Sequence, residues 1–576
     1  MIKLFKNNTR RLIVCPARRW PLTSGRIIPG IAIIACLGAF CSSPSIAQST
    51  RGIAWLPTCP DEGFSAEVFA RTQCGIVTAP LDHLNPSKGD IQFEIRRVRA
   101  KNPTEREGAI FTNPGGPGIP GGFFVMGLAE VWGSYKTEAP GGDAFKRITE
   151  RFDLIGISPR GTGSVEAMRF DCRSDELIEP QNDVTDDRSA ENIRAIRRNA
   201  GIVARGCLAQ KNVLHINSDQ TARDMEFVCV ALKEKKLNYF GVSYGTWLGA
   251  WYGSLFPRHV GRMVLDSNMD WTKTFQAAGI AQAPSREAIF NKFSVEHAAA
   301  NPEIYGMGSN PAAIRKIFLD LQPRVRAAAR FYFSPESLMA ARAISFWLQH
   351  APDLDKDTLL QMAQQHVFSS DATVNQTAKS IAGFQISSIF DSSPTIKPGP
   401  LNLNGATRYA VACNDTFAGG DAYWTAKENE YAQKYPFGGS DITERYCAQW
   451  RAKKPVKPPV EQLAKTDSLL LVQAEFDHFT PAAPAFHAFA NVPNASMVYI
   501  EGVNAHGIFT YAAYPCVNQH VAAYLAYGAK PQRLTVCPKP DETPASLYTM
   551  HSDPERIEQI ILRMKEISGD VAPYVK

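Results

Sequence analysis

Three residues of this 576-residue chain have the types that nucleophilic catalysis requires. Ser243 lies in Gly241-Val242-Ser243-Tyr244-Gly245, Asp477 in Glu475-Phe476-Asp477-His478, and His506 in Asn504-Ala505-His506-Gly507. A serine hydroxyl is a weak nucleophile until a base takes its proton, and a histidine base needs a carboxylate that holds its tautomer and balances the imidazolium. We therefore predict Ser243 as the nucleophile, Asp477 as the acid and His506 as the base, in the chain order Ser, acid, His.

Other residues compete for the roles of acid and base. The rivals are Asp266 and Glu475 for the acid, and His478, His487, His520 and His551 for the base. His487 and His520 fall within helical patterns, and His478 is too near Asp477 in sequence to be its natural partner. His506 is favoured because it stands in a loop beside a glycine, just after a strand-like segment, and Asp266 remains the alternative acid.

A glycine-rich segment offers donors for the oxyanion of a tetrahedral intermediate. Asn113-Pro114-Gly115-Gly116-Pro117-Gly118 follows a strand-like segment over residues 109–112. Glycines let backbone amides approach a ligand, and losing one oxyanion donor lowers the rate by about 100-fold or more. We expect one donor from this loop and the other from the amide of Tyr244.

The segments around these residues alternate β-branched runs with helical patterns, which predicts βαβ units and a mostly parallel sheet. The expected strands are residues 91–97, 109–112, 152–157, 237–242, 262–265, 468–473 and 496–500. Ser243, Asp477 and His506 each follow one of these strands, at the carboxyl edge where side chains of an open sheet converge. The strand before Ser243 and the helical pattern after it are the context of a nucleophile elbow.

The pattern changes between residues 272 and 458, where helical periodicity, aromatic residues and alanine dominate. We predict an α/β-hydrolase fold, with a mostly parallel central sheet, helices on both faces and a mostly helical insertion. The expected core comprises residues 48–271 and 459–576, and the insertion comprises residues 272–458. Residues 453–460, rich in Lys and Pro, are the expected return linker.

The first 47 residues have the pattern of a signal peptide. They contain seven basic and no acidic residues, an apolar run over residues 27–40, and small residues that suit cleavage after Ala47. Residues 33–36 resemble a lipoprotein box ending at Cys36, and residues 9–13 weakly resemble a twin-arginine signal; both are alternatives. We expect an exported protein, periplasmic or secreted, with no membrane span after cleavage.

The net charge of +6 does not indicate a nucleic-acid partner. Without the seven leader cations, 55 of the 62 Lys and Arg remain against 56 Asp and Glu. Nucleic-acid binders concentrate cations in their folded part, so we predict no nucleic-acid partner. We separately expect a monomer.

Cysteine usage fits export. Three of the 12 cysteines lie in the leader, and the remaining nine allow at most four disulfides and leave one thiol. Cys229 is the candidate free thiol because it shares a helix face with Met225 and Leu232. The chain lacks Cys-x-x-Cys and His-x-x-x-His spacings, so we expect neither metal nor cofactor.

Four motifs together resemble the secreted tripeptidyl aminopeptidases, within the wider prolyl-aminopeptidase-like group of α/β-hydrolases. They are residues 113–118, 152–161 (Phe-Asp-Leu-Ile-Gly-Ile-Ser-Pro-Arg-Gly), 241–246 and 477–481, and the resemblance spans roughly residues 55–540. It implies Ser243, Asp477 and His506 as the triad, the amides of Gly116 and Tyr244 as the oxyanion hole, and the insertion as a lid. It also implies that residues 516–537 are the family's C-terminal segment and that the disulfides are Cys59–Cys74, Cys172–Cys207, Cys413–Cys447 and Cys516–Cys537.

Three positions depart from the family pattern: His478 replaces a common Pro, and Ala474 and Ala505 replace common glycines. None of these changes removes a catalytic group, so they bear on the expected substrate preference more than on the expected mechanism. The resemblance implies a peptidase that releases short peptides or residues from free N-termini, with a carboxylesterase as the alternative and a non-catalytic envelope binding protein as the second alternative. A substrate ammonium needs a carboxylate, and the insertion offers Glu296, Glu303, Glu336, Asp353, Asp355 and Asp357.

Overall fold

The computed structural model of the chain describes residues 51–391, 399–415, 419–439, 444–450, 457–539 and 559. The expected signal peptide with Cys36, the first half of the expected linker (residues 453–456) and His551 lie outside the described residues. Within the described ranges, no helix combines the length and the apolar character that crossing a membrane requires.

A ten-stranded sheet organises the molecule. In spatial order its strands are β1 (Gly52–Trp55), β2 (Thr72–Pro80), β3 (Asp90–Val98), β5 (Phe152–Ile157), β4 (Gly108–Asn113), β7 (Leu237–Val242), β8 (Val260–Asp266), β10 (Leu469–Ala474), β11 (Ala495–Ile500) and β12 (Leu534–Cys537). The pairs from β1 to β5 are antiparallel, and every pair from β5 to β12 is parallel. The mostly parallel sheet predicted from the sequence is confirmed.

All seven predicted strands are present, as β3, β4, β5, β7, β8, β10 and β11. The structure adds β1, β2 and β12, and a separate pair formed by β6 (Cys172–Ile178) and β9 (Gly399–Leu403). β4, β5 and β10 are buried along their whole length, whereas β6 and β12 alternate exposed and buried positions. The additional strands escaped prediction because most are short and lack a continuous apolar run.

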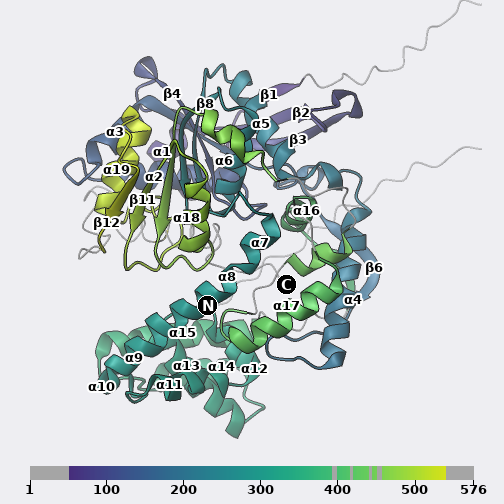
Figure 1. Cartoon of the computed structure of the whole chain (residues 1–576), viewed down its shortest axis with the longest axis vertical. Coiled ribbons are helices and arrows are strands. Elements are labelled where there is room, and N and C mark those ends of the chain that lie inside the picture. The colour runs from purple at the N-terminus through teal and green to yellow at the C-terminus, as the bar shows by residue number, and fades with distance from the viewer. Residues whose placement is uncertain are drawn as a thin grey trace, which may run out of the picture. The chain divides into compact units, whose positions relative to one another are not determined.

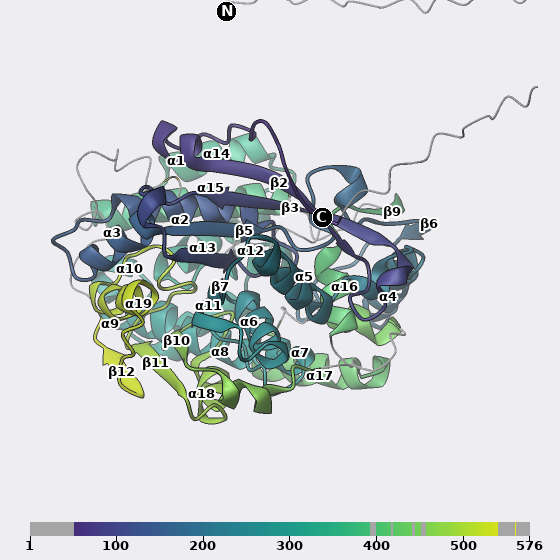
Figure 2. The same ribbon diagram turned by 90° about the horizontal axis from the view of Figure 1, so that it is seen from above.

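Helices cover both faces of the sheet (Figures 1 and 2). One face is covered by α2 (Gly121–Ser134), α3 (Gly142–Arg151) and α19 (Pro515–Tyr527), with α1 (Ala66–Arg71) beside α2. Their core includes Trp132, Phe240 and Phe509. The other face is covered by α5 (Ser218–Ala231), α6 (Tyr244–Leu255) and α18 (Ala482–Ala490). This two-sided burial, at about 25 cal/mol per Å² of apolar surface, is the main force that holds the strand ends in place.

A helical bundle with its own core lies below the sheet in Figure 1. Its helices are α9 (His297–Ala300), α10 (Pro302–Tyr305), α11 (Pro311–Leu319), α12 (Pro323–Ala329), α13 (Pro335–His350), α14 (Lys356–Gln365) and α15 (Ala372–Asp391). It follows α7 (Phe275–Ile280) and α8 (Gln282–Ile289), which leave the sheet after β8.

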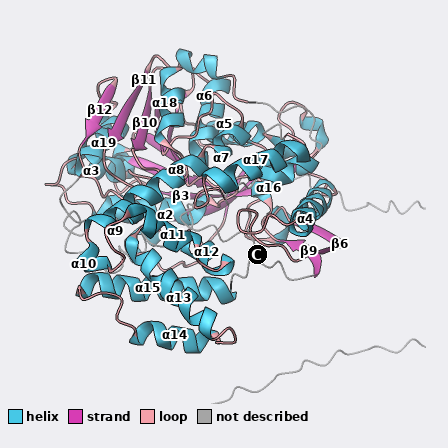
Figure 3. Cartoon of the chain, turned by 60° about the horizontal axis from the view of Figure 1, so that its bottom comes forward, coloured by secondary structure: helices cyan, strands magenta, loops and turns pink. Residues whose placement is uncertain are grey.

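A second set of elements, here called the α16 group, comprises β6, β9, α4 (Ala190–Leu208), α16 (Thr407–Asn414), α17 (Asp421–Lys434) and a short 3-10 helix, η6 (Glu444–Gln449). Figure 3 shows β6 and β9 apart from the main sheet, beside α4. In Figure 1 the group lies beside α7 and α5. Because β6 and α4 precede residue 272, the elements outside the sheet layers come from two stretches of the chain.

Four disulfides join neighbouring cysteines: Cys59–Cys74, Cys172–Cys207, Cys413–Cys447 and Cys516–Cys537. They are the pairs that the family resemblance implies. Two of them, Cys172–Cys207 and Cys413–Cys447, lie within the α16 group. Cys229 is free and buried, as predicted, and burial raises the pKa of its thiol to about 12, so it is an unreactive core residue.

Asp415, just after α16, anchors the α16 group to the helices of the sheet domain. Its carboxylate is buried and accepts hydrogen bonds from the amide of Ser218 (3.1 Å) and from Nε1 of Trp247 (3.3 Å). Burial raises the pKa of Asp415 to about 7, although the hydrogen bonds from Ser218 and Trp247 oppose this shift.

We predict that Asp415→Asn changes how thermal stability depends on pH. The carboxyl group ionises near 3.8 in the unfolded chain and near 7 in the folded one. The folded wild type therefore loses free energy of unfolding, relative to the variant, as the pH rises between these two values, and the loss levels off above them. The Tm of the variant minus that of the wild type should increase from about pH 5 to about pH 8. A constant difference in Tm would contradict the assignment.

Candidate active site

Ser243 occupies the turn between β7 and α6, with a φ of 59° that is uncommon for a residue with a side chain. Such a conformation costs on the order of 1–3 kcal/mol and persists only where neighbours hold it. The amide of Ser243 donates to the carbonyl of Asp266 at 2.9 Å. Gly241 leaves no room for a side chain, because a Cβ there would lie 2.4 Å from Cε1 of Tyr239 and 2.6 Å from the carbonyl oxygen of Gly245. The turn therefore has the geometry of the predicted elbow.

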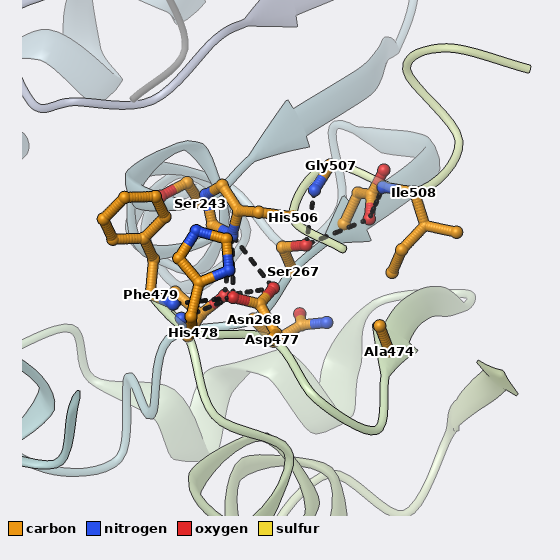
Figure 4. A network of polar contacts seen from close by, with 12 residues as sticks. Ser243, Ser267, Asn268, Ala474, Asp477, His478, Phe479, His506, Gly507 and Ile508 are labelled. Atoms are coloured by element: carbon orange, nitrogen blue, oxygen red, sulfur yellow. Dashed lines mark hydrogen bonds and ion pairs between the residues drawn. The ribbon is translucent and has the colours of Figure 1, made fainter. Parts of the chain in front are cut away.

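Asp477 and His506 lie in the loops that follow β10 and β11. Nδ1 of His506 is 2.9 Å from each carboxylate oxygen of Asp477. Asp477 also accepts from the amides of Phe479 (2.9 Å) and Thr480 (2.8 Å) and from the hydroxyl of Thr480 (2.9 Å). In Figure 4 the imidazole of His506 lies between Ser243 and Asp477, so the ring presents its Nδ1 side to the acid.

Asp477 is fully buried, yet its surroundings favour the charged form. Burial raises the pKa, but the nearby His506, assisted by His478 and the amide of Thr480, outweighs burial and holds the pKa of Asp477 below its ordinary value. An ionised Asp477 keeps a proton on Nδ1 of His506 and balances an imidazolium, which leaves Nε2 as the nitrogen suited to proton transfer.

Asp266, the alternative acid, has a different role. Its carboxylate accepts from the amides of Ile508 (3.0 Å) and Phe509 (2.8 Å), in the loop that carries the histidine. The hydroxyl of Ser267 accepts from the amide of Gly507 at 2.8 Å. Burial raises the pKa of Asp266 to about 7, although the two amides oppose this shift. Asp266 therefore positions the backbone of the loop, while Asp477 contacts the imidazole ring.

The other described rivals have contacts with other residues or lie in a helix, although His478 also helps to hold the pKa of Asp477 low. Glu475 accepts from the amide of Gly502, His478 Nδ1 is 3.2 Å from Oδ1 of Asn504, His487 Nδ1 is 2.9 Å from Oδ2 of Asp270, and His520 lies within α19.

The glycine-rich loop after β4 packs directly on the elbow. A Cβ on Gly115 would lie 2.9 Å from Cβ of Ser243 and 3.3 Å from the amide nitrogen of Tyr244. Among the described residues, the amides of Gly116 and Tyr244 have no hydrogen-bond acceptor. Tyr244 begins α6, so its amide belongs to the positive end of the helix. Both amides are suitable oxyanion donors.

Ser243, His506 and Gly116 line one pocket of about 520 Å³, a size typical of ligand sites. Its other walls come from α7, from the α16 group and from the loops after β5, β8 and β10, and they include Phe275, Leu403, Tyr409, Tyr446, Phe479, Arg169, Asp270 and Arg408. None of the six insertion carboxylates considered above lines this pocket. Asp270 and Arg408 escaped prediction from the sequence, because neither residue stands in a recognisable motif.

Comparisons with known proteins indicate the family of the chain. A family model described as "alpha/beta hydrolase fold" matches residues 117–349, and one described as "TAP-like protein" matches residues 435–537. A tripeptidyl aminopeptidase of Streptomyces coelicolor is 30% identical over 82% of this chain and 84% of its own length.

Two mycobacterial relatives are more distant. Serine protease Hip1 of Mycobacterium tuberculosis is 25% identical over 88% of this chain and 95% of its own length. A protein named carboxylesterase B from the same species is 24% identical over 90% of this chain and 99% of its own length. The chain is therefore a serine hydrolase that belongs to the tripeptidyl aminopeptidase family of α/β-hydrolases.

Proposed function

We propose that the protein is an exported peptidase that cleaves short peptides near their free N-termini through Ser243, His506 and Asp477. The observation that carries this proposal is the contact of His506 Nδ1 with both oxygens of Asp477, at 2.9 Å, beside the strained turn of Ser243. A strained serine next to a buried acid–base pair supports a catalytic role over that of a binding protein.

The proposed reaction is acyl transfer to water. His506 takes the proton of Ser243 at Nε2 while the serine oxygen attacks the scissile carbonyl, and the amides of Gly116 and Tyr244 donate to the oxyanion. The imidazolium then protonates the leaving amine, and the acyl group stays on the serine. Water, deprotonated by the same imidazole, attacks the ester and releases the acyl product.

Export is supported by the leader and by the disulfides. Four disulfides indicate an oxidising compartment, and the basic and apolar run of residues 1–47 fits a cleaved signal. We propose a periplasmic or secreted monomer. In this proposal residues 48–271 and 459–576 form the core and residues 272–458 form the lid, which β6 and α4 extend.

The peptidase assignment draws on the names of two relatives, the tripeptidyl aminopeptidase and serine protease Hip1. The residues that line the pocket are also compatible with a second function. Asp270 is the carboxylate that lines the pocket, and it already contacts His487 and Thr272. Arg169 and Arg408 give the same pocket positive charge. These contacts and the relative named carboxylesterase B favour a carboxylesterase as the alternative.

We predict that Ser243→Ala lowers kcat on peptide anilides and on simple esters by about 1000-fold or more, because the nucleophile is lost. Ser254→Ala is the matched control. Ser254 is buried on the same helix, and its hydroxyl has no hydrogen-bond partner among the described residues. The control should keep wild-type turnover, and wild-type turnover in Ser243→Ala would refute the proposed nucleophile.

The peptidase and the esterase differ in their need for a substrate ammonium. We predict that a tripeptide anilide with a free N-terminus has a kcat/KM about 10-fold or more above that of its acetylated form, because a buried ammonium requires a charged partner. Kinetics on this pair and on a short-chain ester measure the difference. Equal rates on the two anilides, together with faster ester cleavage, would favour the esterase.

A further inference from the structure

The start of α16 touches the loop that carries Gly116. Nη1 of Arg408 donates a hydrogen bond to the carbonyl oxygen of Gly116 at 3.2 Å, and the half-buried Arg408 lines the same pocket as Ser243. A Cβ on Gly118 would lie 3.0 Å from the backbone nitrogen of Arg408. The side chain and the backbone of Arg408 therefore both adjoin the glycine-rich loop of residues 113–118, here called the oxyanion loop.

The preceding residue fixes the same turn of α16 to a second loop. The hydroxyl of Thr407 donates to the carbonyl of Gly161 at 2.6 Å, in the loop that follows β5. Thr407 is buried, and its Cβ is 3.1 Å from the position that a Cβ on Gly118 would occupy. The first turn of α16 is thus held between two loops at the carboxyl edge of the sheet. This fixes the backbone from which the Arg408 side chain extends.

The oxyanion loop needs such an external restraint. Gly116 has a φ of 105°, a conformation that glycine adopts readily, and backbone rotation at a glycine costs little energy. The next residue, Pro117, has no N–H that could fix the loop. The amide of Gly115 donates to Oδ1 of Asn113, and the carbonyl of Gly116 is a second group by which the loop can be held. A hydrogen bond from a cationic donor is about twice as strong as one from a neutral donor.

We infer that Arg408 is a positioning residue of the reaction: by holding the carbonyl of Gly116, it keeps the amide of Gly116 directed at the oxyanion and places a positive charge beside the loop. This inference rests on the proposed function. Because Arg408 belongs to α16, the oxyanion hole then depends on docking of the α16 group, although no element of that group belongs to the ten-stranded sheet. Oxyanion donors act only where they are held in place before the charge develops.

The test compares Arg408→Gln and Arg408→Lys with Arg205→Gln. Arg205 lies on α4 of the same group, pairs with Glu176 at the surface and does not line the pocket, so it is the matched control. We expect Arg408→Gln to lower kcat by about 10- to 100-fold with KM changed less than about 3-fold, Arg408→Lys to lower it less, and Arg205→Gln to match the wild type. The Tm of all three should equal that of the wild type.

A tetrahedral mimic separates positioning from a merely structural role. The serine oxygen adds to the carbonyl carbon of a peptidyl trifluoromethyl ketone, the proton passes to the imidazole, and the ketone oxygen becomes the oxyanion. Affinity for this compound should fall by the same factor as kcat/KM in Arg408→Gln, while affinity for a cleaved product peptide stays unchanged.

Three results with Arg408→Gln would overturn the inference. The first is a wild-type kcat, and the second is an equal loss of affinity for the mimic and for the product, together with a lowered Tm. The third is a raised KM confined to substrates with a carboxylate, which would make Arg408 a substrate-binding residue. Failure of the proposed function is distinct, because Ser243→Ala would then keep its turnover whatever the Arg408 variants do.

Discussion

The carboxyl end of β8 is the point on which the site depends. The carbonyl of Asp266 accepts from the amide of Ser243, and its carboxylate accepts from the amides of Ile508 and Phe509. One buried residue therefore connects the turn of Ser243 with the loop that carries His506. Each hydrogen bond contributes about 1 kcal/mol net, which is comparable with the strain of a serine at positive φ, so the turn is stable only as part of this set. The parallel order of β7, β8, β10 and β11 makes the connection possible because it brings their carboxyl ends to one edge.

The same edge is incomplete without the elements outside the sheet. The pocket is closed by α7 and by the α16 group, which contacts the sheet domain through Asp415, Thr407 and Arg408. The α16 group is stabilised by two disulfides and by the pairing of β6 with β9. The proposed nucleophile, acid and base thus lie in the sheet loops, whereas much of the pocket wall comes from segments outside the sheet. This division fits a family whose relatives include proteins named as peptidase and as esterase.

Much of the sheet and the central residues of the site could be predicted from the sequence. Apolar, β-branched runs such as β5 and β7 carry a local signal, and the residues that follow such runs must meet at one edge. Ser243, Asp477 and His506 are accordingly found together. The pairing of β6 with β9 joins residues more than 200 positions apart and leaves no local signal. Arg408 and Asp270 reach the pocket through tertiary packing alone, and the six insertion carboxylates show that residue type without position does not identify a binding group.

In the proposed mechanism Ser243 is the residue that becomes acylated. The most direct measurement is reaction of the active protein with a fluorophosphonate, followed by proteolysis and mass spectrometry of the modified peptide. We expect one phosphonyl group per molecule, on Ser243, with loss of activity proportional to labelling. Complete inactivation with the label on another residue, or full activity with Ser243 modified, would show that Ser243 is not the nucleophile.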